Sequence, residues 1–216
     1  MNGIIQELTG LLKTKNIGTD SDRALLLDFQ ATLETKPEKA IKLEKDALAQ
    51  IENITADNAR LVSNLHANLG GLYRMNGHPD LAREHMEKSI SLLDQFNLLH
   101  INDSIPQIAN YAMFLTEQQE PERGISELQK LSGIIKEYHS DDCLDYAKVQ
   151  ETLGTIYLMT ANLPQAKTHF KRAFKIYEKI WADEPEMIEA KYQEIQELYP
   201  QIGFCIGKNL SGLLTK

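Results

Sequence analysis

Two asparagines, Asn68 and Asn110, stand 42 residues apart in this chain, and their side chains have the chemistry to bind a peptide backbone. Each carries a carboxamide, which both donates and accepts hydrogen bonds. Such a group can pair with the N–H and C=O of an extended peptide whatever the peptide's sequence. These residues therefore indicate recognition of a peptide, and the alternative is that they only hydrogen-bond between neighbouring helices.

The densest cluster of reactive residue types lies at Glu137, His139, Asp141, Asp142 and Cys143. No second cluster supplies further ligands at a recognisable spacing, so a metal site or a catalytic site is disfavoured. The cluster falls in a predicted loop, where Asp141 or Asp142 is expected to cap the next helix.

Motifs for cofactor chemistry are missing from the sequence. It has no Walker loop, dinucleotide fingerprint, nucleophile elbow or zinc-protease helix. We therefore expect a protein that is not an enzyme and that needs no cofactor and no metal.

A sequence repeat must position the two asparagines. Leu69, Gly70, Tyr73 and Ala82 recur, at twice the interval between the asparagines, as the matching set Leu153, Gly154, Tyr157 and Ala166. The residues 42 positions after the first set form a degenerate copy around Asn110. The residues 42 positions before the first set form a further copy around Leu27. Four copies thus fit between positions 20 and 187, and the interval is the repeat period.

Each copy has two stretches of helical periodicity with a break between them. In the second copy the break contains Gly77, which suits a helix C-terminus, and Pro79, which suits a first helical turn. The pattern predicts a helical hairpin in which Gly70 packs opposite Ala82, since two helices approach closely only where side chains are small.

These motifs resemble the tetratricopeptide repeat, whose helices carry Leu-Gly-x-x-Tyr and Ala-x-x-x-Phe. The period of this chain exceeds the family's usual unit of about 34 residues and is similar to that of kinesin light chains and related bacterial proteins. The resemblance implies an all-α, right-handed α-solenoid of about four hairpins that acts as a protein-binding scaffold.

In stacked hairpins the first helices line a concave groove. Residues off the packing stripe of these helices form the predicted site for a peptide or partner: Asn64, Asn68, Gly71, Arg74, Asn110, Met113, Lys148, Glu151, Thr152 and Thr155. Asn68 and Asn110 would form two rungs of an asparagine ladder, similar to the one by which proteins of the kinesin light chain type hold cargo peptides. Gly71 would keep the groove open beside Asn68.

The predicted organisation has three parts. An N-terminal capping helix covers residues 1–19, four repeats cover 20–61, 62–103, 104–145 and 146–187, and capping helices cover 188–216. A solenoid exposes its last apolar face, so the C-terminal segment is expected to be a cap. The same segment could instead join two copies in a homodimer.

The composition of the chain limits the class of partner and the cellular compartment that we expect for it. The net charge of −8 argues against nucleic acid as the main partner. No apolar stretch is long enough for a membrane span, and the two cysteines are too few for a disulfide framework. We expect a cytoplasmic protein that binds a protein or a peptide, with no nucleic acid and no membrane as partner.

Three roles follow from this interpretation. The first is an interaction module that binds an extended peptide or partner helix in the groove. The alternatives are a regulatory sensor whose curvature responds to a peptide and a structural subunit of an oligomeric assembly.

Overall fold

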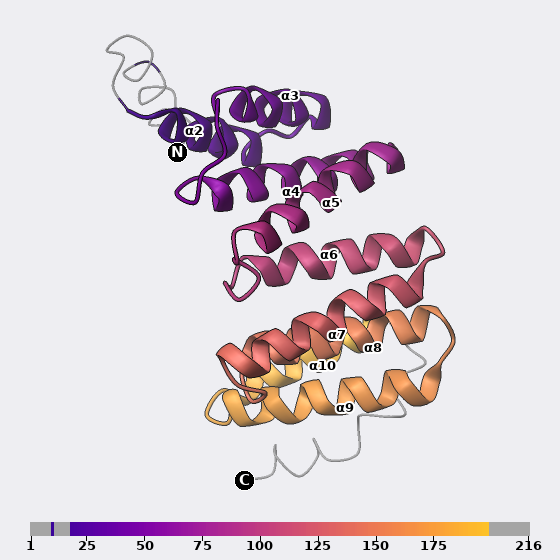
Figure 1. The fold of residues 1–216 in the computed structure, drawn as a ribbon. Coiled ribbons are helices and arrows are strands. Elements are labelled where there is room, and N and C mark those ends of the chain that lie inside the picture. The colour runs from indigo at the N-terminus through magenta and orange to yellow at the C-terminus, as the bar shows by residue number, and fades with distance from the viewer. Residues whose placement is uncertain (1–9, 11–17, 199–216) are drawn as a thin grey trace. The chain divides into compact units, whose positions relative to one another are not determined.

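The computed structural model describes residue 10 and residues 18–198, and all regular elements within that part are helices (Figure 1). They are α2 (Asp20–Thr32), α3 (Pro37–Leu48), α4 (Ala59–Met75), α5 (Pro79–Gln95), α6 (Ser104–Glu117), α7 (Pro121–Tyr138), α8 (Leu144–Met159), α9 (Leu163–Ile180) and α10 (Pro185–Leu198). The all-α prediction is confirmed for this part of the chain. The predicted cap at 1–19 lies almost wholly outside the described residues, as do positions 199–216 of the C-terminal segment.

Proline marks the start of the second helix in each hairpin. Pro37, Pro79 and Pro121 open α3, α5 and α7 at intervals of one repeat period, and Pro164 lies in the first turn of α9. The first turn has no intrahelical acceptor for its N–H groups, so proline costs nothing there and fixes the helical φ in advance.

The turns before these prolines share one backbone conformation. Gly77, Gln119 and Ala161, again one repeat period apart, have φ of 74°, 65° and 58°. The next N–H in each turn bonds back to the last turn of the helix, as from His78 to the Tyr73 carbonyl at 2.9 Å. This is the Schellman closure, which satisfies free carbonyls at a helix end and needs a left-handed residue. Glycine supplies it at only one of the three turns.

Small residues set the helix crossings in three hairpins. A Cβ at Gly70 would lie 2.6 Å from Met86 Cγ and 3.3 Å from the Ala82 carbonyl oxygen, so α4 and α5 meet as predicted. A Cβ at Gly154 would lie 2.8 Å from the Phe170 ring. In the hairpin of α6 and α7 the glycine is on the second helix, because a Cβ at Gly124 would lie 2.6 Å from the Ala112 carbonyl oxygen.

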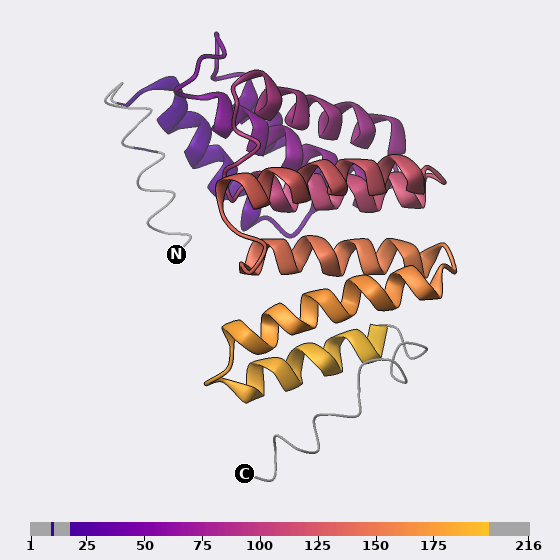
Figure 2. The same ribbon diagram turned by 60° about the horizontal axis from the view of Figure 1, so that its bottom comes forward.

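The described helices form two compact units, Met1–Tyr111 and Ala112–Lys216, with their boundary inside α6. In the first unit α2 packs with α3 and α4 with α5, around buried Leu65, Leu69 and Leu93. In the second unit α7, α8, α9 and α10 follow one another around Phe114, Phe170 and Tyr177 (Figure 2). α10 packs on α9 by stacking Tyr192 on Phe174 at a centroid distance of 4.1 Å.

Candidate functional site

The outer face of α4 carries four of the predicted site residues in one row. Asn64, Asn68, Gly71 and Arg74 are all partly exposed. No atom lies within 4 Å of the position that a Cβ on Gly71 would take, whereas its neighbour Gly70 is fully packed. Gly71 is therefore not required for packing, and the space in front of it is open.

Asn68 uses its amide to join three helices of the first unit. Its Nδ2 donates to Asp28 Oδ1 on α2 at 2.8 Å and to Glu44 Oε1 on α3 at 3.1 Å. Both amide protons are thereby engaged, and the carbonyl oxygen Oδ1 is the atom of this side chain left to meet a ligand. The predicted contact between neighbouring helices is thus present at Asn68.

Asn64 belongs to a second polar network, which ties α4 to α5 and α6. Its Oδ1 accepts from Gln107 Nε2 at 2.5 Å, and Gln107 Oε1 accepts from Ser63 and Ser89 at 2.8 and 2.5 Å. Gln107 was not predicted to matter. The sequence carries a signal for Gln107, because it is a polar residue at a repeat position where the copies before and after it have the buried apolar residues Leu65 and Val149.

The other site residues divide between the two units. Asn110 on α6 is exposed and belongs to the first unit, while Met113 on the same helix is partly exposed and belongs to the second. The structure therefore brings Asn64, Asn68, Gly71, Arg74 and Asn110 into one unit.

The predicted residues of α8 are held mainly by contacts inside the second unit. Glu151 accepts from Tyr177 Oη at 2.6 Å and pairs with Lys191 Nζ on α10 at 2.8 Å. Thr152 and Thr155 donate to backbone carbonyls one turn earlier, and Thr155 is buried. Lys148 is exposed and lies 3.8 Å from Asp145.

Glu44, which is buried, and Asp28, which is partly exposed, form an acid pair beside Asn68. Glu44 is only 1% exposed, and its Oε2 accepts no hydrogen bond from the described residues. Burial, together with the charge of Asp28 and a hydrogen bond to it, raises the pKa of Glu44 to about 8. Burial also raises the pKa of Asp28, against the hydrogen bonds from Glu44 and Asn68. Burial therefore favours the protonated form of the Glu44 carboxyl near neutral pH.

A histidine pair joins α4 and α5. His66 Nδ1 lies 2.9 Å from His85 Nδ1, and His85 stacks on Tyr73 with centroids 5.4 Å apart. Burial and the neighbouring His85 lower the pKa of His66 to about 4. Two nitrogens share this bond only if one of them accepts, so a neutral pair fits the geometry.

The second unit repeats this arrangement two repeat periods later. His169 stacks on Tyr157 at 5.3 Å, and its Nδ1 lies 2.9 Å from Gln150 Oε1. The position of His66 is here taken by Gln150, which supports a structural role for this bond.

The reactive cluster at Glu137–Cys143 spans the last turn of α7, the loop that follows and the N-cap of α8. The prediction that Asp141 or Asp142 caps α8 is wrong. Cys143 is the N-cap, and its Sγ accepts from the Tyr146 N–H at 3.4 Å. Asp142 instead pairs with Lys179 on α9, because the turn places it beside that helix.

Residues 18–198 offer neither a metal-binding cluster nor a membrane-spanning helix. No group of three or more His, Cys, Asp or Glu in this range has the geometry to hold a metal ion. None of the described helices is both long enough and apolar enough to cross a bilayer.

Comparison with known families shows which repeat family part of the chain resembles. Residues 104–179 match the model of the tetratricopeptide repeat. Helices α6–α9 therefore resemble tetratricopeptide repeats. The matched range holds α6–α9, which include the degenerate third copy and the clear motif at Leu153, Gly154 and Tyr157. No curated protein gives a significant match to the sequence.

Several solved structures share the fold of this chain. The crystal structure of BtubC (BKLC) from P. vanneervenii has a TM-score of 0.71 at 18% identity, over 92% of this chain and 80% of that one. A variant of a Podosopora anserina protein, with nearly identical TPR-like repeats of the kinesin light chain type, has a TM-score of 0.66 at 15% identity, over 84% and 90%. MamA has a TM-score of 0.56 at 15% identity, over 82% and 89%. The predicted helical-repeat solenoid and its likeness to kinesin light chain repeats are confirmed.

Proposed function

We propose that this protein is a non-catalytic interaction module that binds an extended peptide of a partner protein along the first helices of its first unit. Tetratricopeptide repeats generally serve protein–protein interaction, and arrays of this kind bind along the faces of their helices. The observation that carries the proposal is the open space at Gly71, flanked by Asn68 and Arg74 on α4.

The peptide backbone is held by Asn110, whose exposed carboxamide offers both a donor and an acceptor, and by the Oδ1 of Asn68. Arg74 on α4 selects side chains of the peptide by charge. We place the protein in the cytoplasm, with neither nucleic acid nor a membrane as its partner.

Filling the space at Gly71 tests this proposal. A library of displayed peptides is selected on the wild-type chain, and the selected peptides are measured against Gly71→Leu. Leucine fits without a clash, because no neighbour lies within 4 Å of the Cβ position, and its side chain occupies the place of the peptide. We expect binding to fall at least about tenfold, the effect of about 1.4 kcal/mol.

Gly133→Leu is the matched control, because Gly133 is an exposed glycine of α7 that also has no neighbour within 4 Å. Asn110→Ala should weaken the same peptides. Peptides that bind Gly71→Leu and Asn110→Ala as tightly as the wild type would refute the site.

A further inference from the structure

The last repeat carries a row of cations that the repeat itself does not require. α9 has the sequence LPQAKTHFKRAFKIYEKI, with Lys167, Lys171, Arg172, Lys175 and Lys179 and a single acid, Glu178. All five cations are exposed. The chain as a whole has a net charge of −8, so this local excess of positive charge runs against the composition.

The four lysines recur every fourth residue, which aligns them along one face of the helix. The buried residues of α9, among them Phe170, Ala173 and Tyr177, occupy the opposite face. At the matching positions of α7, one repeat period earlier, stand Ile125, Gln129, Gly133 and Glu137 in place of the lysines. Packing of a hairpin therefore explains the apolar face of α9 but not its lysines.

These cations are largely unpaired. In the part of the chain that the structure describes, Lys167, Lys171 and Lys175 have no ion pair and no hydrogen bond. Lys179 pairs with Asp142, and Arg172 donates a long bond of 3.4 Å to Gln150. Like charges on neighbouring turns repel one another, so an anionic partner would stabilise this face.

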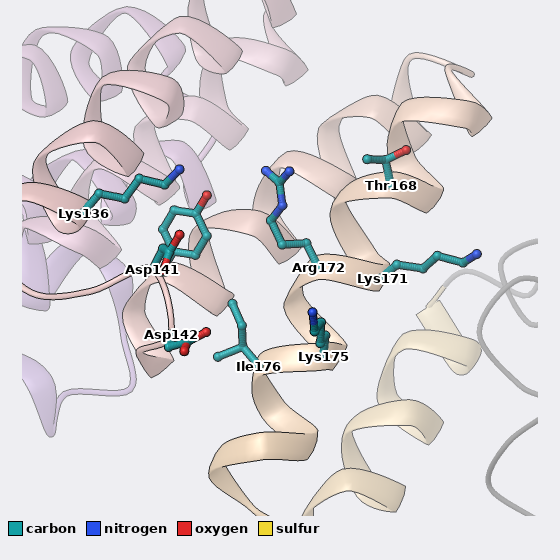
Figure 3. Close-up of a pocket in the computed structure, with 9 residues that line it drawn as sticks. Lys136, Asp141, Asp142, Thr168, Lys171, Arg172, Lys175 and Ile176 are labelled. Carbon is teal, nitrogen blue, oxygen red and sulfur yellow. The ribbon is translucent and has the colours of Figure 1, made fainter.

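A hollow of about 520 Å³ opens beside the row, between α9, the end of α7 and the start of α8. Lys136 and Arg172 line it, and their side chains extend toward one another from α7 and α9 (Figure 3). Lys136 Nζ lies 5.2 Å from the centroid of the Tyr146 ring. Tyr146 and Ile176 are nearly buried and close the bottom of the hollow.

We propose that this basic face, defined as Lys136, Lys167, Lys171, Arg172 and Lys175, binds an acidic segment of a partner protein. The row from residue 167 to residue 179 extends about 18 Å along the helix, which matches about six residues of extended chain. One carboxylate of the segment enters the hollow between Lys136 and Arg172, and the others meet the lysines of the row.

A protein segment suits this face better than a membrane or a nucleic acid does. Asp141 and Asp142 lie at the rim of the hollow, where they repel a continuous anionic surface or a dense phosphate backbone. A flexible peptide can place its carboxylates away from these two acids. This surface lies on a second helix and is separate from the peptide site proposed on the first helices.

The test uses the full chain and a fluorescent peptide of alternating glutamate and serine, with a glutamine–serine peptide of the same length as control. We expect the glutamate peptide to bind at low salt and to dissociate as salt rises, since exposed charges are screened. Lys171→Glu with Lys175→Glu should reduce its affinity at least about tenfold, because two attractions become repulsions. Lys39→Glu with Lys42→Glu, at exposed sites on α3, gives the same change in net charge and should leave the affinity nearly unchanged.

Three results with the glutamate peptide would overturn the proposal. The first is that the glutamate peptide does not bind at low salt. The second is that the α3 variant loses as much affinity for it as the α9 variant does. The third is that the α9 variant keeps its affinity for the glutamate peptide. Vesicles containing phosphatidylserine and single-stranded DNA are measured in parallel. If either binds through the α9 lysines more tightly than the peptide does, the partner class is wrong. Should the double variant fold poorly by circular dichroism, Lys171→Gln with Lys175→Gln replaces it and should give a smaller loss in the same direction.

Discussion

Asp28 and Glu44 occupy, in the first hairpin, the two repeat positions that Gly70 and Met86 occupy in the second. Where Gly70 packs against Met86 and Gly154 against Phe170, the first hairpin holds two carboxyl groups bridged by Asn68. Polar groups in such a place are costly unless they share protons and hydrogen bonds. A protonated, neutral Glu44 is therefore expected to stabilise the first unit.

Glu44→Gln should stabilise the protein at pH 8 by about 1–3 kcal/mol. The pKa of Glu44 is about 8 in the folded chain against an ordinary 4.5, so unfolding releases a proton between these values and stability falls as pH rises through that window. Glutamine reproduces the neutral side chain and keeps an oxygen that accepts from Asn68. Urea unfolding at pH 5 and pH 8 checks this, with Glu52→Gln at an exposed loop position as control. An equal gain at both pH values would contradict it.

Asn68→Ala and Asn110→Ala should differ in stability. Loss of the Asn68 amide leaves Asp28 and Glu44 without their shared donor, so we expect a cost of about 1–3 kcal/mol in the free energy of unfolding. Asn110 is exposed, and its truncation should cost less than about 0.5 kcal/mol. Chemical denaturation of both variants measures the difference. Similar values would mean that the bonds of Asn68 contribute little.

Two glycines of α7 should respond oppositely to alanine. At Gly124 a Cβ would lie 2.6 Å from the Ala112 carbonyl oxygen, a backbone atom that cannot yield easily. We expect Gly124→Ala to destabilise the protein by about 1–3 kcal/mol. Gly133 has open space, so Gly133→Ala should stabilise it by about 0.5–1 kcal/mol through helix propensity. Thermal unfolding measures the change in stability of the two variants. If both are stabilised or both are destabilised, the close helix crossing at Gly124 is rejected.

Ala161→Gly should stabilise the turn between α8 and α9. Ala161 has a φ of 58°, a conformation that costs an L-residue about 1–2 kcal/mol. Glycine removes this strain at some cost in entropy, so the expected gain is about 0.5–1 kcal/mol. Ala190→Gly, inside α10, is the control and should instead destabilise by about 1 kcal/mol. A loss of stability in both variants would show that the turn is not strained.

His66→Gln should reduce the loss of stability in acid. The pKa of His66 is about 4 in the folded chain against an ordinary 6.5, so unfolding takes up a proton between these values and stability falls as pH drops through that window. A glutamine at position 66 can bond to His85 as Gln150 bonds to His169, and it takes up no proton in this range of pH. At pH 5, relative to pH 7.5, the variant should gain on the order of 1 kcal/mol over the wild type. A constant difference at the two pH values would argue against the histidine pair.

The sequence predicted the hairpins well because their signals are local. Apolar periodicity, Pro79 after Gly77, and the recurrence of Leu69, Gly70 and Tyr73 at Leu153, Gly154 and Tyr157 depend on residues close in the chain. The cap of α8 was misassigned to aspartate because the same loop offers several side chains with cap chemistry. Backbone geometry selected Cys143 and left Asp142 to Lys179.

The sequence by itself determined the repeat period, the helical class and the identity of the small residues at the crossings, since each is set by spacing along one or two helices. Only the tertiary structure decided which polar groups meet. Asn68 reaches Asp28 and Glu44, and Gln107 reaches Ser63 and Ser89, across 18 to 44 residues of sequence. The physical reason is that a buried polar atom takes its partner from whichever helix packing brings within hydrogen-bond distance, and spacing along a single helix does not contain that information.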